Sequence, residues 1–298
     1  MKAIVPIEPI ASRITSNVPI TETVWAAGTY SLGDRRYVDT TLYEVIVAST
    51  SLSPSAGLLT DPPEWEVVSE INRFKMFDSI EGSQTAISST GGSIEVAFDA
   101  AGTVITDVVL LNLEGSNVNI DVSVASVSIY NEDFSLQDFD EITDWYNFFF
   151  AEIIPQNDIV IGDVPNRSDT VVTVTVTNEY ADDIAVGEMV VGRAFVLGDT
   201  LFDTSMSIFD FSQKTADENG NYSITEGRFI KEVSYNVGIP SNRVSAVYKF
   251  LQNYRAVPLV WVGEDSRLET VAYGFFRDFS IVLSNPAYSS CSLQVESL

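Results

Sequence analysis

Several kinds of chemistry are excluded by residues that the chain lacks. The chain of 298 residues contains no histidine, which excludes Ser-His-Asp triads, Cys-His pairs and every metal site that needs imidazole. A single cysteine, Cys291, excludes an intrachain disulfide and a zinc site held by thiolates. Because Cys291 lies in the alternating run SSCSLQVESL, we expect its thiol to be buried among apolar side chains. A phosphate-binding loop is missing too, since no GxxxxGKS or GxxxxGKT motif surrounds Gly91-Gly92.

Basic residues are scarce. The chain has 16 Lys and Arg against 42 Asp and Glu, a formal net charge of −26, and no basic residue lies between Lys75 and Arg167. Nucleic acids and anionic membrane surfaces attract Lys and Arg, so this balance argues against both as partners. It fits a soluble protein, or one that faces a basic neighbour in an assembly. The acidic stretch predicts a solvated surface or, alternatively, a face that binds cations or docks a partner.

Long hydrophobic runs are missing as well. No segment reaches the ~18 consecutive apolar residues of a membrane-spanning helix. The N-terminus has a short apolar run that Pro6 and Pro9 break, which is not the pattern of a signal peptide. We therefore expect no membrane insertion, and synthesis in the cytoplasm. With 45% apolar residues, the chain is long enough for a packed core and for two or three domains.

Alternation of apolar and polar residues is the dominant pattern of the chain, which we expect to be mainly β. It predicts strands at 94–98, 118–130, 171–177 and 185–197, and a buried strand pair at 104–113. Gly187 and Gly192 are expected to be kinks or bulges in the 185–197 strand. Short strands separated by turn signals favour an antiparallel, jelly-roll-like β-sandwich. For 138–150 we expect a helical turn, or a loop that lays aromatic side chains across one sheet.

The last hundred residues carry a different pattern, in which one helix accompanies several strands. Asn219-Gly220 predicts a hairpin turn, and the run 228–239 alternates as a strand. Ser241-Asn242 is expected to cap a helix at 242–255. The apolar face of that helix has residues at helical spacing: Val244, Val247, Tyr248 and Leu251. Closing strands follow at 259–263, 269–283 and 288–298, which predicts a C-terminal α+β domain with one helix on a sheet.

Aromatic residues gather in a short stretch near the N-terminus, from Trp25 to Asp78, which also carries the turn signals Gly33-Asp34 and Pro62-Pro63. Carbohydrate-binding proteins stack exposed Trp and Tyr rings on the apolar faces of sugars. The candidate glycan-binding residues are Trp25, Tyr30, Tyr43 and Trp65. A module of ~55 residues also needs its aromatic side chains as core, so both roles stay open for each of the four.

Four acidic residues are clustered next to Trp145 and Tyr146. Asp138, Asp140, Glu141 and Asp144 offer oxygen ligands for Ca²⁺, or an acid pair for glycoside hydrolysis. Their spacing matches no defined calcium loop, and closeness in sequence does not place two carboxyl groups across a cleft. We expect a solvated acidic loop, with no metal site, no cofactor and no catalytic residue.

Two parts of the chain carry a resemblance to known proteins. The pattern W…Y..GD…Y…PP.W resembles small chitin- and cellulose-binding modules, and NRFKMFD at 72–78 resembles a segment that ends such modules in tailed-bacteriophage virion proteins. Chitin-binding relatives carry a pair of exposed tryptophans where this chain has Val47–Thr50, so a docking or spacer role is an equal alternative to sugar binding. The order of an acidic β-sandwich, VGEMVVGRAFVLGDT, a helix, RAVPLVWVG, YGFFRDFSI and a final CSLQVESL resembles tailed-phage tail-tip proteins across much of the chain.

This resemblance implies a structural, non-enzymatic virion protein of a phage tail tip or baseplate. Such a protein assembles with itself and with other tail proteins, and it can contact the host surface. A host-glycan binding adhesin is the alternative, and a polysaccharide depolymerase is a less favoured one. The expected organisation is an extended arm at 1–20, a small carbohydrate-binding-like β module at 21–80, an acidic β-sandwich at 81–200 and a C-terminal α+β assembly domain at 201–298. The arm would lie on a neighbouring subunit or form a strand of its own domain.

Overall fold

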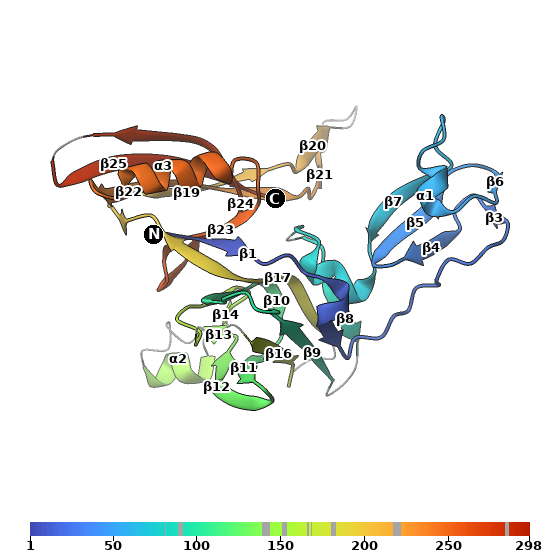
Figure 1. The fold of residues 1–298 in the computed structure, drawn as a ribbon, viewed down its shortest axis with the longest axis horizontal. Helices are drawn as coiled ribbons and strands as arrows, with labels where there is room; N and C mark the ends of the chain where they lie inside the picture. The colour runs from blue at the N-terminus through green and yellow to red at the C-terminus, as the bar shows by residue number, and fades with distance from the viewer. Residues whose placement is uncertain are drawn as a thin grey trace. The chain divides into compact units, whose positions relative to one another are not determined.

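The structure is a computed structural model that describes residues 1–80, 82–88, 92–138, 144–150, 154–165, 167, 169–179, 183–216, 222–283 and 286–298. The described chain is mainly β, with antiparallel strands and short helices, as the sequence predicts (Figure 1). Contacts between residues divide it into two compact units. The terminal unit joins Met1–Ile7 to Val191–Leu298, and the inserted unit is Glu8–Val190. The division falls inside one strand, β17 (Asp183–Val196).

The terminal unit is built on one antiparallel sheet. Its strands lie in the order β17-β1-β23-β24-β25-β22, and both β18 and β19 pair with the other side of β22. The bounds are β1 (Lys2–Pro6), β18 (Asp199–Thr200), β19 (Ser205–Asp210), β22 (Phe229–Pro240), β23 (Leu259–Glu264), β24 (Arg267–Val282) and β25 (Tyr288–Ser297). The predicted strand at 228–239 and the three closing strands are confirmed.

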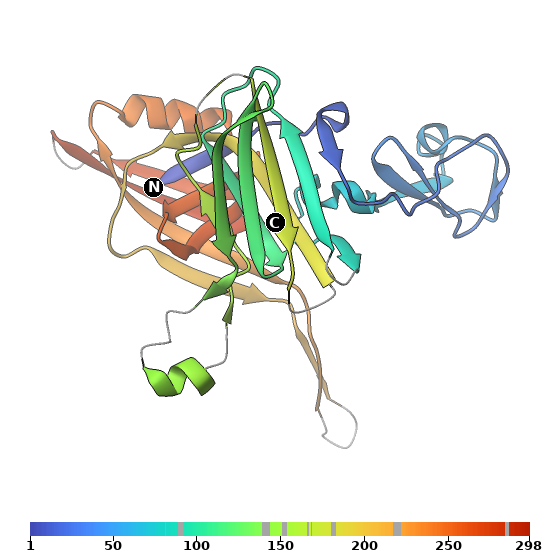
Figure 2. The same cartoon turned by 90° about the horizontal axis from the view of Figure 1, so that it is seen from below.

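A separate hairpin extends from this sheet (Figure 2). It consists of β20 (Gln213–Ala216) and β21 (Tyr222–Thr225), which pair in antiparallel register with Ala216 opposite Tyr222. The predicted Asn219-Gly220 turn lies outside the described residues.

One helix, α3 (Val244–Asn253), packs on the sheet of the terminal unit (Figure 1). Its Val247, Phe250 and Leu251 side chains share a core cluster with Tyr235 of β22 and Trp261 of β23. Both aromatic side chains are buried, and the polar atom of each has a hydrogen-bond partner. The Tyr235 hydroxyl donates to the carbonyl of residue 270 over 2.7 Å, and the Trp261 indole N–H donates to the carbonyl of residue 274 over 3.0 Å. The predicted arrangement of one helix on a sheet is therefore confirmed.

The start and the buried face of α3 correct the sequence prediction. The helix begins at Val244 with Arg243 as its N-cap residue and without a side-chain cap, so Ser241-Asn242 does not cap it. Its buried stripe includes Phe250, while Tyr248 is 51% exposed. The physical reason is a long-range contact: the ring of Phe195 in β17 stacks on Phe250, with centroids 4.2 Å apart and planes 3° apart. Helical spacing alone does not reveal that contact.

The N-terminal segment supplies a central strand. β1 pairs with β17 on one side and with β23 on the other, and its Ala3 and Ile4 side chains are fully buried. Of the two roles left open for residues 1–20, a strand within the chain's own fold is the one observed at β1. Gly192 of β17 faces this strand, and a Cβ atom there would collide with the Val5 carbonyl. Gly192 therefore permits close approach of β1, where the sequence suggested a kink or bulge.

The inserted unit contains a five-stranded antiparallel sheet in the order β12-β11-β16-β9-β2, whose strands lie side by side in Figure 2. The bounds are β2 (Ile14–Ser16), β9 (Ser93–Asp99), β11 (Asn117–Val124), β12 (Val127–Ser135) and β16 (Thr170–Thr177). Alternation positions the core: Val118, Ile120 and Val122 of β11 are fully buried. The sequence predicted one run at 118–130, but Ala125 and Ser126 form a turn in it with φ of 49° and 65°. Neither residue type signals such a turn.

The remaining elements of the inserted unit are short. They are η1 (Ala11–Arg13), η2 (Asn72–Phe77), β8 (Thr85–Ser88), β10 (Asp107–Glu114), β13 (Gln137–Asp138), α2 (Trp145–Phe150), β14 (Ile154–Pro155) and β15 (Ile159–Ile161). The predicted strand pair at 104–113 is wrong: the segment forms the single strand β10, which reads as continuously apolar because most of its side chains are buried on both faces. The expected boundaries at residues 20, 80 and 200 stay predictions.

The aromatic module has small sheets of its own within the inserted unit. Strands β4 (Arg35–Val38), β5 (Thr41–Val45) and β7 (Trp65–Glu70) form an antiparallel sheet, and β3 (Tyr30–Ser31) pairs with β6 (Ser49–Thr50). Helix α1 (Pro54–Gly57) has Ser53 as its N-cap, whose hydroxyl accepts from the Ala56 N–H. Among the described residues of the whole chain, no helix is long and apolar enough to cross a bilayer.

Candidate functional site

The core of the aromatic module is built around Trp65. This side chain is fully buried, and its indole N–H donates to the Leu52 carbonyl over 3.2 Å. The ring of Tyr30, itself 7% exposed, meets Trp65 edge to face with centroids 5.5 Å apart, and the Tyr30 hydroxyl donates to the Ala26 carbonyl. Helix α1 comes so close that a Cβ atom on Gly57 would overlap the Trp65 ring. Trp65 and Tyr30 thus occupy the core role of the two that the sequence left open.

The other two candidate glycan-binding residues lie at the rim of this core. Trp25 and Tyr43 are partly buried and pack against the Trp65 cluster. The indole N–H of Trp25 is buried and has no hydrogen-bond partner among the described residues. The guanidinium of Arg36 lies 4.9 Å from the centroid of the Tyr30 ring and covers it. The four residues are therefore gathered in one cluster, but as placed they present no continuous ring platform. Glycan binding through them stays a prediction.

The predicted metal or acid cluster lies mostly outside the described residues. Asp140, Glu141 and the side chain of Asp138 are not described, while Asp144 is exposed. Within the part of the chain that the structure describes, no group of three or more acidic or cysteine side chains is arranged to hold a metal ion. The absence of a metal site and of catalytic residues stays an expectation from the sequence.

Helix α2 decides between the two alternatives for residues 138–150. The sequence suggested a helical turn, or a loop that lays aromatic side chains across one sheet, and Trp145–Phe150 form a helical turn. The side chains of Trp145, Tyr146, Phe149 and Phe150 are between 67% and 80% exposed. The Trp145 and Phe149 rings stack on one another, with centroids 6.3 Å apart and planes 22° apart. Spacing of four along a helix places these two rings on the same side of it.

Ionised residues are divided unevenly between the two units. The inserted unit has six basic and thirty acidic residues, and the terminal unit has ten basic and twelve acidic residues. Their formal net charges are therefore −24 and −2. Almost the whole charge of the protein lies on the inserted unit, which makes the terminal unit the part that other copies of this chain repel least.

The outer face of the β11–β12 hairpin illustrates how the inserted unit carries its charge. Asn119 donates to Asp133 over 2.9 Å, and the Tyr130 hydroxyl donates to Glu132 over 2.9 Å. Partial burial, together with Glu132, raises the pKa of Tyr130 to about 12. Neutral donors accompany these carboxylates, so the face keeps its negative charge. The cation-binding and partner-docking roles of this acidic surface stay predictions.

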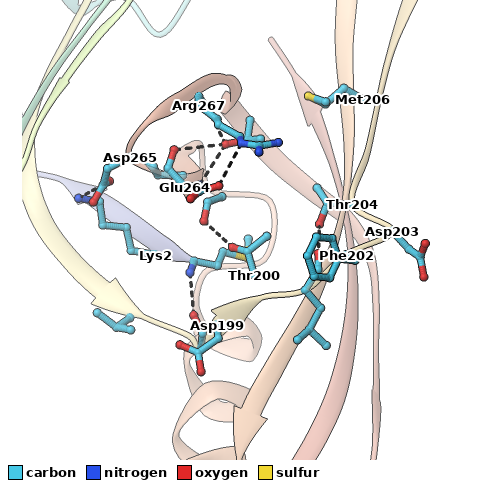
Figure 3. A pocket seen from close by; sticks show the side chains of 17 residues that line it. Lys2, Asp199, Thr200, Phe202, Asp203, Thr204, Met206, Glu264, Asp265 and Arg267 are labelled. Carbon is cyan, nitrogen blue, oxygen red and sulfur yellow. Dashed lines mark hydrogen bonds and ion pairs between the residues drawn. The ribbon is translucent and has the colours of Figure 1, made fainter.

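A cavity of about 700 Å³ lies in the terminal unit (Figure 3). Two ion pairs flank it: Lys2 Nζ lies 2.9 Å from Asp265 Oδ1, and Arg267 Nε lies 3.3 Å from Glu264 Oε2. At the edge of the cavity lies Phe202, in the turn between β18 and β19, whose side chain is 97% exposed. These paired charges and hydroxyls suit polar contacts.

Exposed apolar side chains gather on one part of the terminal unit, which we call the apolar edge: strand β19 and the β20–β21 hairpin. The exposed side chains are Met206 (50%), Ile208 (68%), Phe209 (55%), Phe211 (50%), Tyr222 (65%) and Ile224 (74%). Single exposed apolar residues are ordinary, but the four from Met206 to Phe211 follow one another along one strand edge and mark an interaction surface. In the hairpin, the ammonium of Lys214 lies 3.8 Å from the centroid of the Tyr222 ring. This surface was not predicted from the sequence. The run SMSIF does carry a signal, because apolar residues on both faces of a strand indicate two covered faces.

Comparison with protein families and with curated proteins finds no match. Comparison with solved structures finds weak likeness to carbohydrate-binding modules. A chitosan-binding module from a chitosanase/glucanase of Paenibacillus sp. IK-5 aligns with a TM-score of 0.29 and 12% identity, over 41% of this chain and 84% of that one. The module CBM32-1 from a family 31 glycoside hydrolase of Clostridium perfringens aligns with a TM-score of 0.28 and 12% identity, over 62% and 96%. Likeness at this level assigns neither a fold nor a ligand to the chain.

Proposed function

We propose that the chain is a structural protein of a tailed-phage particle, in the tail tip or baseplate, and that it works by associating with other subunits. The observation that carries the proposal is the apolar edge. A strand and a hairpin with six large apolar side chains at least half exposed suit a surface that is covered in an assembly. An isolated protein in solution would gain solubility by replacing them with charged residues.

Two further features support the same proposal. The sequence resembles tailed-phage tail-tip proteins across much of the chain, as the order of an acidic β-sandwich and the motifs from residue 186 to the C-terminus indicates. The separation of charge also fits, because the nearly neutral terminal unit carries the exposed apolar surface while the acidic inserted unit has the composition of a solvated face. The partners would be other tail proteins and further copies of this chain.

Mass spectrometry of purified particles tests the proposal. Particles banded by density from a lysate in which this chain is produced should contain peptides from both units, in an amount that corresponds to several copies per particle. Immunogold labelling should then mark the tail end of the particle. The control is the particle-free supernatant of the same lysate. Peptides found in the supernatant and absent from washed particles would rule the proposal out.

Host-glycan binding is a second candidate function, and the exposed aromatic side chains of α2 favour it. Trp145, Tyr146, Phe149 and Phe150 are 67% to 80% exposed, and exposed aromatic rings are the groups that sugars stack on. A pull-down with host cell wall would measure binding by the intact chain and by the Trp145→Ala variant. Binding that the variant loses supports this function, and no binding by the intact chain counts against it. Release of reducing sugar from the wall would favour the depolymerase alternative.

A further inference from the structure

Strand β19 is an open edge of the sheet in the terminal unit. β22 pairs with β25 along one side and with β18 and β19 along the other. Residues Ser205–Asp210 pair with residues 234–229 of β22, and among the described strands none pairs with the opposite side of β19. Its outward N–H and C=O groups are therefore available to another strand.

The side chains of β19 are those of a strand with a partner. Met206 lies opposite Val233, a fully buried residue of the cluster beneath α3, so Met206 and Ile208 extend that apolar face beyond the helix. Phe209 points to the other face and meets Phe211 edge to face, with centroids 4.8 Å apart. Natural edge strands are protected from pairing by lysine, proline or a bulge. Residues 205–209 contain none of the three.

The charge distribution permits a second copy of this chain as the partner at this edge. Two whole chains of net charge −26 repel each other, but they repel least where the terminal units meet, since each of these carries only −2. The edge itself is nearly uncharged: its one acidic side chain, Asp210, sits at the end of the strand. There it accepts from both the N–H and the hydroxyl of Ser212, over 2.8 and 2.7 Å. A second copy of the chain offers the same apolar, uncharged strand.

Symmetry then fixes the register. An antiparallel pair of identical strands has a two-fold axis perpendicular to the sheet, which passes through a residue that faces its own counterpart. An axis at Ser207 sets Met206 of one copy opposite Ile208 of the other, on the face that bears α3. An axis at Ile208 would set Met206 opposite the charged Asp210, and an axis at Met206 would set Ile208 opposite the polar Thr204. The first arrangement joins apolar side chains and opposes no like charges.

We propose that β19 pairs antiparallel with β19 of a second copy of this chain, about a two-fold axis at Ser207, so that two terminal units share one continuous sheet. This inference rests on the proposed assembly function and names its first partner. It also requires the dimer to strengthen as salt is added, because about 0.15 M salt shortens the reach of the repulsion between the acidic inserted units to about 8 Å.

A cysteine at the axis tests the register. In the Ser207→Cys variant the two new side chains face each other with Cβ atoms about 4.5–5.5 Å apart, within a small adjustment of disulfide geometry. We expect a disulfide-linked dimer on a non-reducing gel after mild oxidation. Native Cys291 does not compete, because it is buried and burial raises the pKa of its thiol to about 11. The matched control is Ser245→Cys on the exposed side of α3. Equal crosslinking by both variants would overturn the register.

A charge on the edge tests the interface in the full chain. Ile208→Lys places an ammonium opposite Met206, and we expect the dimer dissociation constant measured by sedimentation to rise at least about tenfold. Ile208 is 68% exposed but lies opposite Lys231 of β22 in its own chain, so the like charges should lower the melting temperature of the variant by no more than about 8 °C. The control is Val282→Lys, which changes an exposed residue of β24 away from the edge. A parent chain that stays monomeric at all salt concentrations overturns the inference.

The failure of this inference and that of the proposed function are separate outcomes. A monomeric chain that is present in purified particles refutes the pairing of two copies and leaves the proposed function standing, with another particle protein on β19. A dimer that crosslinks through Ser207→Cys but is absent from particles supports the pairing and refutes the proposed function.

Discussion

Replacement of Trp65 by alanine should unfold the aromatic module without unfolding the rest of the protein. Trp65 is the largest of the fully buried residues in the module, where it holds the edge of Tyr30 and a hydrogen bond to Leu52. Removal of a buried tryptophan costs about 3–5 kcal/mol. A module of about 50 residues has a free energy of unfolding of roughly 2–8 kcal/mol, at about 0.05–0.15 kcal/mol per residue. The loss is therefore comparable with the whole stability of the module.

Hydrogen exchange measures this loss locally. In the parent, the backbone amides of Val45 and Ile46 donate to the backbone carbonyls of Asp34 and Glu64 over 3.0 Å, so their exchange reports on unfolding of the module. Their protection should fall by roughly two to four powers of ten in Trp65→Ala, since each 1.4 kcal/mol is a factor of ten. The same substitution at Trp145, which is 80% exposed, should change stability by less than about 0.5 kcal/mol. Unchanged protection of both amides in Trp65→Ala would refute the assignment of this residue to the core.

Three further predictions concern other buried positions. Gly57→Ala should destabilise the module by about 1–3 kcal/mol in urea unfolding, because the added Cβ overlaps the Trp65 ring, and the Trp65→Phe background should reduce that cost. Leu251→Ala, under α3, should lower the free energy of unfolding of the terminal unit by about 2–5 kcal/mol. The Cys291 thiol should react with a disulfide reagent near pH 8 only after denaturation. Since its folded pKa is raised from 9.0 to about 11, its contribution to stability is complete below pH 9.0 and is lost as the pH rises toward 11, and Cys291→Ala should make the slope in that range shallower.

The strands of the fold could be predicted from the sequence because side-chain alternation is a local property. Runs such as Val118–Val124 and Thr170–Thr177 are strands in the structure, and their inward residues are those that the pattern indicates. Local patterns failed where a distant contact decided the outcome. The turn at Ala125-Ser126 and the burial of Phe250 both depend on neighbours that the sequence near them does not specify.

For the candidate site, the sequence predicted which residues lie together but not whether each ring is buried or exposed. The sequence gathered Trp25, Tyr30, Tyr43 and Trp65 into one module, and the structure brings them into one cluster. A ring is part of the core where another element covers its face of the strand, and it can bind a ligand where nothing does. Here helix α1 covers Trp65, because Gly57 has no side chain and lets the helix approach the ring. The exposed side chains of β19 were missed for a related reason, because exposure at an edge is a property of strand order and not of the strand itself.

Strand β1 has a consequence for the order in which the chain folds during synthesis. It leaves the ribosome before both of its partners, because β17 and β23 follow about 190 and 260 residues later, which takes roughly 10 to 50 seconds at about 5–20 residues per second. The inserted unit has emerged in full before either partner strand is complete. During that interval the apolar Ala3 and Ile4 have no sheet to enter. A strand that is made long before its partners thus enters the sheet late, and a substitution in β1 acts on a late step in the folding of the terminal unit.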